Sequence, residues 1–227
     1  MAQSRRKSPV KNNKNNSATK PDAALAHRGK DDGVPYDIIA LAASAGGLNA
    51  LSKVLESLPE DFPATIVIVQ HLDPRHRSLM AEILSRRTDL PVQEAAEGIH
   101  LKSGKVYVAP PDRHLLVNLD DTVSLTQSEL VHFVRPSADL LFESVAASHK
   151  ERAIAVVLTG TGSDGVMGVQ AIKKMGGTVI AQDKDTAEFF GMPEAAIHTG
   201  SVDFILPLDD IGPALTTLVM HGKPGEQ

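Results

Sequence analysis

Residues 38–47 read IIALAASAGG, a six-residue apolar run that ends in a serine, an alanine and two glycines. An unbroken apolar run of this length is typical of a strand that is buried on both faces of a parallel sheet. An apolar pattern at helical spacing begins at Leu48 and stops before Pro59. The stretch therefore predicts a strand, a tight turn and a helix, with Ser44 at the carboxyl end of the strand. In open α/β sheets, ligands bind at this edge.

The alternation of strand and helix continues along the chain. Further apolar runs of the strand type occupy residues 64–69, 91–95, 153–159, 178–182 and 202–206. Segments with helical spacing lie between them, around residues 79–84, 140–146, 169–175 and 208–220, with a short helix near 193. Strands that alternate with helices predict an α/β fold with a doubly wound, mostly parallel, Rossmann-like sheet.

The middle of the chain has a different pattern. Residues 105–109 and 114–118 look like two strands around the turn PPDR at 110–113, and residues 122–125 are a candidate third strand. Short strands joined by tight turns favour antiparallel pairing. We expect this region to form an antiparallel β extension of the main sheet.

The composition indicates a single large globular domain, which we place at residues 36–220. Of the 227 residues, 42% are hydrophobic, enough for a sizeable core. The chain has no apolar run of about 18 residues and no apolar segment behind its basic N-terminus, so we expect neither membrane insertion nor a secretory signal. Cysteine is absent, which excludes disulfides and fits a cytoplasmic protein.

Charge is distributed unevenly. Residues 1–33 hold eight Lys/Arg and three Asp/Glu, a net of +5, whereas the remaining 15 Lys/Arg and 25 Asp/Glu give residues 34–227 a net of −10. The polar, basic composition predicts that residues 1–35 form a disordered tail. Such a tail either improves solubility or contacts an acidic partner. The acidic body and the absence of Trp argue against nucleic acid as the partner.

Three polar residues follow buried strands. Ser44 and His71 come at the ends of the first two strands, and Asp164 lies in the loop after residues 153–159. Parallel strands end at the same edge of a sheet, so we expect these side chains to lie close together. A serine hydroxyl becomes nucleophilic when an imidazole takes its proton, and a carboxylate orients that imidazole. The chain order Ser–His–Asp differs from the Ser–Asp–His order of α/β-hydrolases, which indicates another fold.

Each of these residues also has a simpler interpretation. Ser44 alone is a common kind of helix N-cap. The loop GTGSDG at 160–165 could cradle a phosphate, although it lacks the lysine and the spacing of a Walker loop. His71 lies near Asp73 and His76, but no further convergent ligand is evident, so we predict no metal site. The histidines at 114, 132, 149 and 198 share no pattern, and Asp112 and Arg113 are interpreted as turn residues.

Several motifs together resemble the CheB-type chemotaxis methylesterase catalytic domain, from about Tyr36 to Leu215. They are ASAGG at 43–47, VQHL at 69–72, YVAPPD at 107–112, RPS at 135–137, LTGTGSDG at 158–165 and FGMP at 190–193. The resemblance implies hydrolysis of glutamate methyl esters on the cytoplasmic helices of chemoreceptors, and possible deamidation of glutamines, in the sensory adaptation of a signalling phosphorelay. It implies Ser44 as nucleophile, His71 as general base and then acid, and Asp164 as the residue that orients His71, without a cofactor.

The chain departs from the usual family pattern in three respects. Ala42 and Ala45 replace a glycine and a threonine beside the serine, and Thr161 replaces a frequent methionine. Backbone N–H groups beside Ser44 and in the loop after residue 159 are candidate oxyanion donors, with Ala45 and Thr161 as the expected residues. Residues 1–35 are too few for the family's usual receiver domain, so a stand-alone catalytic domain is expected.

These departures leave two interpretations. The first is an esterase that acts on a methylated chemoreceptor or a related sensory protein. The second is a catalytically diverged binding module in a receptor or two-component signalling assembly.

Overall fold

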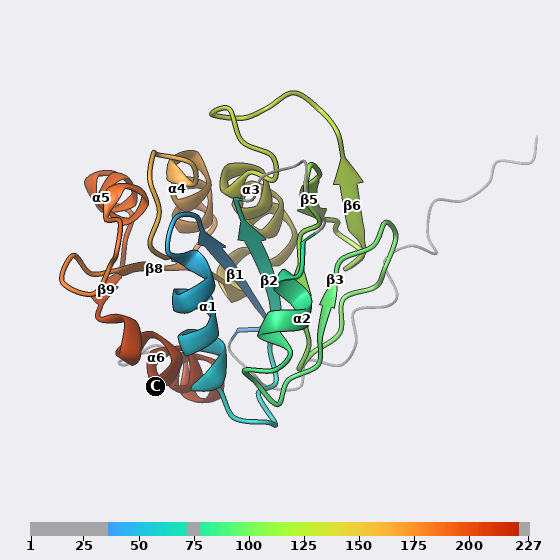
Figure 1. The fold of residues 1–227 in the computed structure, drawn as a ribbon, viewed down its shortest axis with the longest axis horizontal. Helices are drawn as coiled ribbons and strands as arrows, with labels where there is room; N and C mark the ends of the chain where they lie inside the picture. The colour runs from blue at the N-terminus through green and yellow to red at the C-terminus, as the bar shows by residue number, and fades with distance from the viewer. Residues whose placement is uncertain (1–35, 72–77, 223–227) are drawn as a thin grey trace, which may run out of the picture.

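The computed structural model describes residues 36–71 and 78–222. These residues build a seven-stranded sheet, and helices cover it (Figure 1). Every pair of neighbouring strands in this sheet is parallel. In spatial order the strands are β3 (Val92–Glu94), β4 (Val106–Val108), β2 (Thr65–Gln70), β1 (Ile38–Ala43), β7 (Ala153–Val157), β8 (Thr178–Gln182) and β9 (Phe204–Leu206). The doubly wound α/β fold predicted from the sequence is confirmed.

The strands with the most continuous apolar runs lie in the middle of the sheet. All residues of β1, β2, β7 and β8 are buried, because helices cover both faces there. Alternate side chains of β1 point to opposite layers, Ile39 and Leu41 to one and Ile38 and Ala40 to the other. A strand in this position needs apolar side chains on both sides, which explains the absence of polar alternation.

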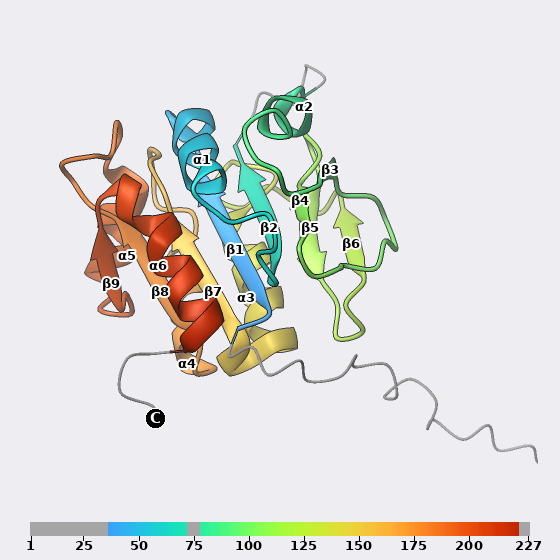
Figure 2. The same ribbon diagram turned by 90° about the horizontal axis from the view of Figure 1, so that it is seen from below.

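The helices form two layers, one on each face of the sheet (Figure 2). One layer contains α1 (Gly47–Glu56), α2 (Met80–Leu84) and α6 (Leu208–His221). The other contains α3 (Ala138–His149), α4 (Val166–Lys174) and α5 (Gly191–His198), with a single 3₁₀ turn at Lys150–Arg152. Within the parts of the chain that the structure describes, no helix is both long and apolar enough to cross a bilayer.

The antiparallel extension exists, but its strands pair differently from the expectation. Residues 105–109 and 114–118 do not pair with each other. Instead, β4 lies inside the main sheet between β2 and β3, while β5 (His114–Val117) pairs with β6 (Val123–Thr126) in a separate hairpin. Pro110 and Pro111 follow β4 and cannot donate to a strand ladder, so the chain leaves the sheet there instead of reversing within it.

The order of the strands creates a crevice at one place along the carboxyl edge. From β1 the chain builds β2, β3 and β4 on one side, and then β7, β8 and β9 on the other. Helix α1 follows β1 on one face of the sheet, whereas α4 follows β7 on the opposite face. The edge between β1 and β7 is therefore a topological switch point, where doubly wound proteins bind their ligands.

Helices α3 and α4 approach closely where α4 carries a glycine. A Cβ added to Gly168 would lie 2.5 Å from Phe142 Cβ and 3.2 Å from Asp139 Cα. We predict that Gly168→Ala lowers the free energy of unfolding by about 1–3 kcal/mol, because overpacking outweighs the gain in helix propensity. Urea denaturation measures the change. Gln170→Ala on the exposed side of α4 is the matched control and should stay within about 0.5 kcal/mol of wild type. A Gly168→Ala variant as stable as wild type would contradict this account.

Candidate active site

Ser44 follows β1 directly and is fixed by its main chain from both neighbouring strands. Its N–H donates to the carbonyl of Thr159 at 3.0 Å, and its carbonyl accepts from the Gln70 side-chain amide at 2.7 Å. Helix α1 has Gly46 as its N-cap, at φ 76°, and no side chain caps it. The interpretation of Ser44 as an N-cap is therefore wrong, and its hydroxyl is not engaged in capping α1.

His71 follows β2 and lies beside Ser44. Its backbone N–H donates to the carbonyl of Ala43 at 3.1 Å, and its ring Nε2 lies 2.8 Å from Asp164 Oδ2. The side chains of His71 and Asp164 are 11% and 3% exposed. The structure thus brings the histidine and the aspartate into direct contact across 93 residues of sequence. Among the described hydrogen bonds, none joins the Ser44 hydroxyl to His71.

The Asp164 carboxylate lies at the N-terminus of α3 and accepts several hydrogen bonds there. The Ser137 hydroxyl donates to Oδ1 at 2.8 Å, and the backbone N–H groups of Ala138 and Asp139 donate to Oδ2 at 2.6 Å and to Oδ1 at 3.2 Å. Burial alone would raise the pKa of Asp164, but the hydrogen bonds from His71, Ala138 and Ser137 together lower it below its ordinary value. Asp164 is therefore an ionised acceptor at neutral pH.

An ionised Asp164 determines which ring nitrogen of His71 carries the hydrogen. A carboxylate only accepts hydrogen bonds, so Nε2 of His71 carries a hydrogen directed at Oδ2. In the neutral imidazole the other nitrogen, Nδ1, is then a free acceptor. The arrangement leaves Nδ1 as the nitrogen that can take a proton from a nearby hydroxyl.

A second buried histidine holds Ser137 in place. His114 is fully buried in β5, its Nδ1 accepts the Ser137 backbone N–H at 3.1 Å, and its Nε2 donates to the Glu129 carbonyl at 3.0 Å. Burial lowers the pKa of His114, so the ring stays neutral and Nδ1 keeps its lone pair. His114 thus links the β5–β6 hairpin to the helix terminus that binds Asp164.

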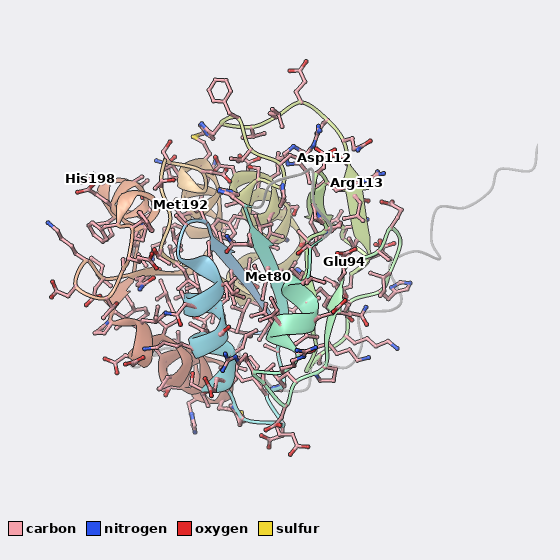
Figure 3. The ribbon with its side chains drawn as sticks, in the orientation of Figure 1. Met80, Glu94, Asp112, Arg113, Met192 and His198 are labelled. Carbon is pink, nitrogen blue, oxygen red and sulfur yellow. The ribbon has the colours of Figure 1, made fainter. Side chains whose placement is uncertain are left out.

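The segment between β6 and α3 is anchored by an ion pair. Arg135 donates from Nε and Nη2 to Asp112 Oδ1, at 2.9 and 2.6 Å, and from Nη1 to the carbonyls of Gln127 and Ser128. Figure 3 labels Asp112 near this segment. Interpreting Asp112 as only a turn residue was therefore incomplete. In the sequence, the contact between Asp112 and Arg135 was indicated only by two motifs. Asp112 ends the YVAPPD motif, and Arg135 begins the RPS motif that also contains Ser137.

The glycine-rich loop after β7 packs directly against Ser44. A Cβ added to Gly160 would lie 2.9 Å from Ser44 Cβ. The N–H of Gly160 donates to the Phe189 carbonyl, and the Gly160 carbonyl accepts from the Met192 N–H, both at 2.8 Å. The backbone N–H groups of Ala45 and Thr161, the two expected oxyanion donors, have no acceptor among the residues described.

The alternative of a metal site at His71 involves Asp73 and His76, which lie outside the described residues. Within residues 36–71 and 78–222, no three His, Asp or Glu side chains are grouped so that they could hold a metal ion.

The fold and this edge define a class of protein, an α/β protein with serine, histidine and aspartate gathered at a topological switch point. The family model described as CheB methylesterase matches residues 39–215. The chain belongs to the CheB methylesterase family, as the resemblance in its motifs implied. Members of this family are hydrolases.

Individual relatives agree with this membership. A protein of Leptospira interrogans named putative protein-glutamate methylesterase/protein-glutamine glutaminase is 44% identical over 176 residues, which cover 78% of this chain and 91% of the relative. The protein-glutamate methylesterase/protein-glutamine glutaminase of Thermotoga maritima is 40% identical over 185 residues, 80% of this chain and 54% of the relative. The chain thus spans about half of that longer relative.

A solved structure has the same fold. The crystal structure of the Thermotoga maritima CheB methylesterase catalytic domain aligns with a TM-score of 0.78 at 40% identity. The alignment covers 81% of this chain and 99% of that one. The seven-stranded sheet and its helices are therefore those of a catalytic domain of this family.

The buried histidine of the hairpin should make stability depend on pH. In the unfolded chain His114 titrates near its ordinary pKa of about 6.5, whereas the folded ring stays neutral to a lower pH. Below about pH 6.5 the unfolded chain therefore binds a proton that the folded ring does not, and stability falls. The loss linked to Asp164 comes only below about pH 4, because its pKa is lowered from a value near 3.9.

We predict that His114→Leu is less stable than wild type at pH 7 by about 1–3 kcal/mol, because the Ser137 N–H and the Glu129 carbonyl lose their partner. The variant should also lose less stability than wild type between pH 7 and pH 5. Chemical denaturation at pH 7, 6 and 5 measures both effects, with His198→Gln, an exposed histidine on α5, as control. Parallel pH profiles for wild type and His114→Leu would show that His114 is not the titrating group.

Proposed function

We propose that this protein hydrolyses methyl esters of glutamate side chains on methylated chemoreceptors or related sensory proteins, with Ser44, His71 and Asp164 as its catalytic residues. The observation that carries the proposal is the 2.8 Å bond between His71 and the buried Asp164, next to Ser44 at the switch point. Family membership supports the reaction, since relatives are named protein-glutamate methylesterases.

The first half of the reaction forms an acyl-enzyme. The Ser44 hydroxyl turns toward Nδ1 of His71, gives up its proton there, and its oxygen attacks the carbonyl carbon of the ester. When the tetrahedral intermediate collapses, the bond to the methoxy group breaks. His71 returns the proton to that oxygen, and methanol leaves. The imidazolium that forms between these steps is stabilised by the ionised Asp164 on Nε2.

The second half regenerates the enzyme. A water molecule gives a proton to His71 and attacks the acyl carbon, and the bond to Ser44 breaks as the serine oxygen takes that proton back. The product is a glutamate carboxylate on the substrate protein. With an amide in place of the ester, the same sequence releases ammonia, which matches the glutaminase part of the relatives' names.

The oxyanion of each intermediate needs donors, and we assign the backbone N–H groups of Ala45 and Thr161 to this role. Both are free among the described residues, and the loop that carries Thr161 packs against Ser44. One such donor contributes about 2.7–4 kcal/mol to a transition state. Because the donors are main-chain groups, alanine and threonine at these positions remain compatible with catalysis. Because the glutamate esters of chemoreceptors lie on their cytoplasmic helices, the proposed reaction takes place in the cytoplasm.

Replacing the nucleophile tests the proposal directly. We predict that Ser44→Ala lowers methanol release from a methylated receptor by at least about 10³-fold and leaves the fold intact. Gas chromatography of methanol measures the rate, and circular dichroism checks the fold. Ser85→Ala, an exposed serine after α2, is the control and should keep wild-type activity. Undiminished release by Ser44→Ala would exclude Ser44 as nucleophile.

Replacing the carboxylate tests the orientation of the histidine. We predict that Asp164→Asn lowers kcat by about 10⁴-fold, as the equivalent change does in serine proteases, because an amide can donate to Nε2 and favour the wrong tautomer. A fluorophosphonate probe should label Ser44 in wild type and label Asp164→Asn far more slowly. Absence of labelling in the folded wild-type protein would instead favour a catalytically diverged binding module.

A further inference from the structure

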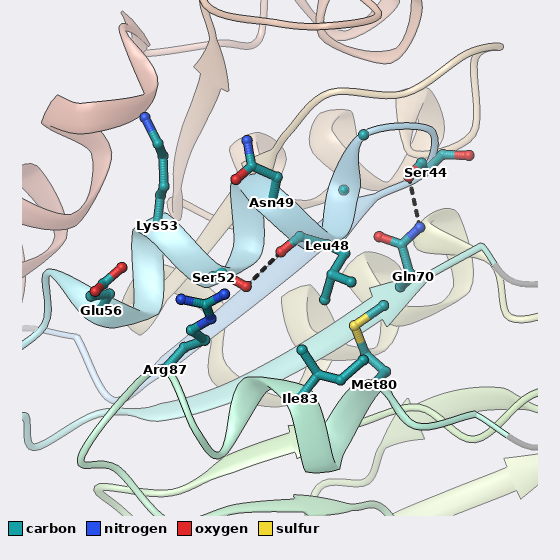
Figure 4. Close-up of a pocket in the computed structure, with 12 residues that line it drawn as sticks. Ser44, Leu48, Asn49, Ser52, Lys53, Glu56, Gln70, Met80, Ile83 and Arg87 are labelled. Carbon is teal, nitrogen blue, oxygen red and sulfur yellow. Dashed lines mark hydrogen bonds between the residues drawn. The ribbon is translucent and has the colours of Figure 1, made fainter.

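A groove of about 650 Å³ runs from Ser44 along the outer side of α1 (Figure 4). Helix α1 forms one wall and α2 the other. Ser44 and Gln70 lie at one end of the view, and Lys53, Glu56 and Arg87 lie at the other. The groove therefore leads away from the proposed nucleophile for most of the length of α1.

The part of the groove near Ser44 is apolar. Leu48 is 37% exposed on α1, and it faces Met80 and Ile83 of α2 across the groove in Figure 4. Ile83 is half-buried and Met80 is only 5% exposed, so Leu48 offers the largest apolar contact in this part of the groove. Asn49 and Ser52 add hydrogen-bonding groups along the same wall.

The far end of the groove carries charges of both signs, with Lys53 and Arg87 cationic and Glu56 anionic. Of its three charged residues, Lys53 donates to Asp209 at 3.1 Å and is partly neutralised. Arg87 is exposed and has no ion-pair partner among the described residues. Arg86 beside it is exposed as well, so two cationic side chains lie at this end of α2.

The proposed reaction requires a surface beside Ser44 on which a polypeptide can lie. A glutamyl side chain is short, so the main chain that carries the ester stays close to Ser44 during attack. The residues before or after the ester must then lie on the enzyme beside the serine. Each hydrolysis also leaves a carboxylate, so a segment with several such glutamates is acidic and would complement Arg87.

We propose that the groove between α1 and α2 binds the polypeptide segment that flanks the esterified glutamate. Apolar side chains of the segment contact Leu48, Met80 and Ile83, and a carboxylate of the segment pairs with Arg87. The inference rests on the proposed function, since it names how that same site selects its substrate. The chain's own N-terminal segment is a poorer match for this end, because residues 1–33 carry a net charge of +5.

The test compares two reactants of Ser44, a methylated receptor and a small fluorophosphonate. Methanol release from a methylated receptor depends on the groove, whereas labelling of Ser44 by a small fluorophosphonate does not. We expect Arg87→Glu to lower kcat/KM for the receptor about fivefold or more, mostly through KM, with labelling close to wild type. Higher salt should weaken receptor hydrolysis by wild type and reduce its advantage over the variant.

Two further variants sharpen the comparison. Leu48→Ser removes an apolar contact without changing charge and should also lower kcat/KM for the receptor. Lys174→Glu makes the same charge reversal at the exposed end of α4, outside the groove, and should behave as wild type. Equal rates on the receptor for Arg87→Glu and Lys174→Glu would overturn the groove as a binding site while leaving the esterase intact. Wild type that neither releases methanol nor takes the label would overturn both proposals.

Discussion

The site depends on one buried carboxylate. Asp164 accepts hydrogen bonds from the end of β2, from the N-cap of α3 and from the first amides of that helix. A buried charge is costly unless it is paired and hydrogen-bonded, so these donors must all be held in place at once. Satisfying Asp164 therefore fixes the N-terminus of α3 and the ring of His71 relative to each other at the sheet edge.

This constraint gives the β5–β6 hairpin a role in the site, although it lies outside the main sheet. The hairpin contributes His114, whose neutral ring accepts from Ser137, and the segment after it is clamped by Arg135 on Asp112. Ser137 in turn donates to Asp164. The hydrogen bonds thus run in sequence from the hairpin to the N-terminus of α3, to the Asp164 carboxylate and to the His71 ring.

The sequence predicts which residues gather at the edge of the sheet, but it does not predict the supporting contacts around them. Ser44, His71 and Asp164 could be placed at one edge because each follows an apolar run, and parallel strands share a carboxyl edge. The position of β4 inside the sheet could not be inferred, because three buried residues before a proline pair suit either a hairpin or a central strand. The contacts of His114 and Asp112 could not be inferred either, since side-chain bonds across 23 residues leave no periodic pattern.

The two sides of Ser44 differ in a way that fits a reaction on a protein. On the side of β7 and α3, the site is closed by hydrogen bonds and by close backbone packing at Gly160, which suits groups that must not move during catalysis. On the side of α1 and α2, the surface is open, with Leu48 and Ile83 near the serine and the exposed Arg87 further on. In the proposal, the closed wall holds the reacting groups and the open wall recognises the substrate. We therefore expect a change in the open wall to alter the choice of substrate without disturbing the hydrogen bonds of Asp164.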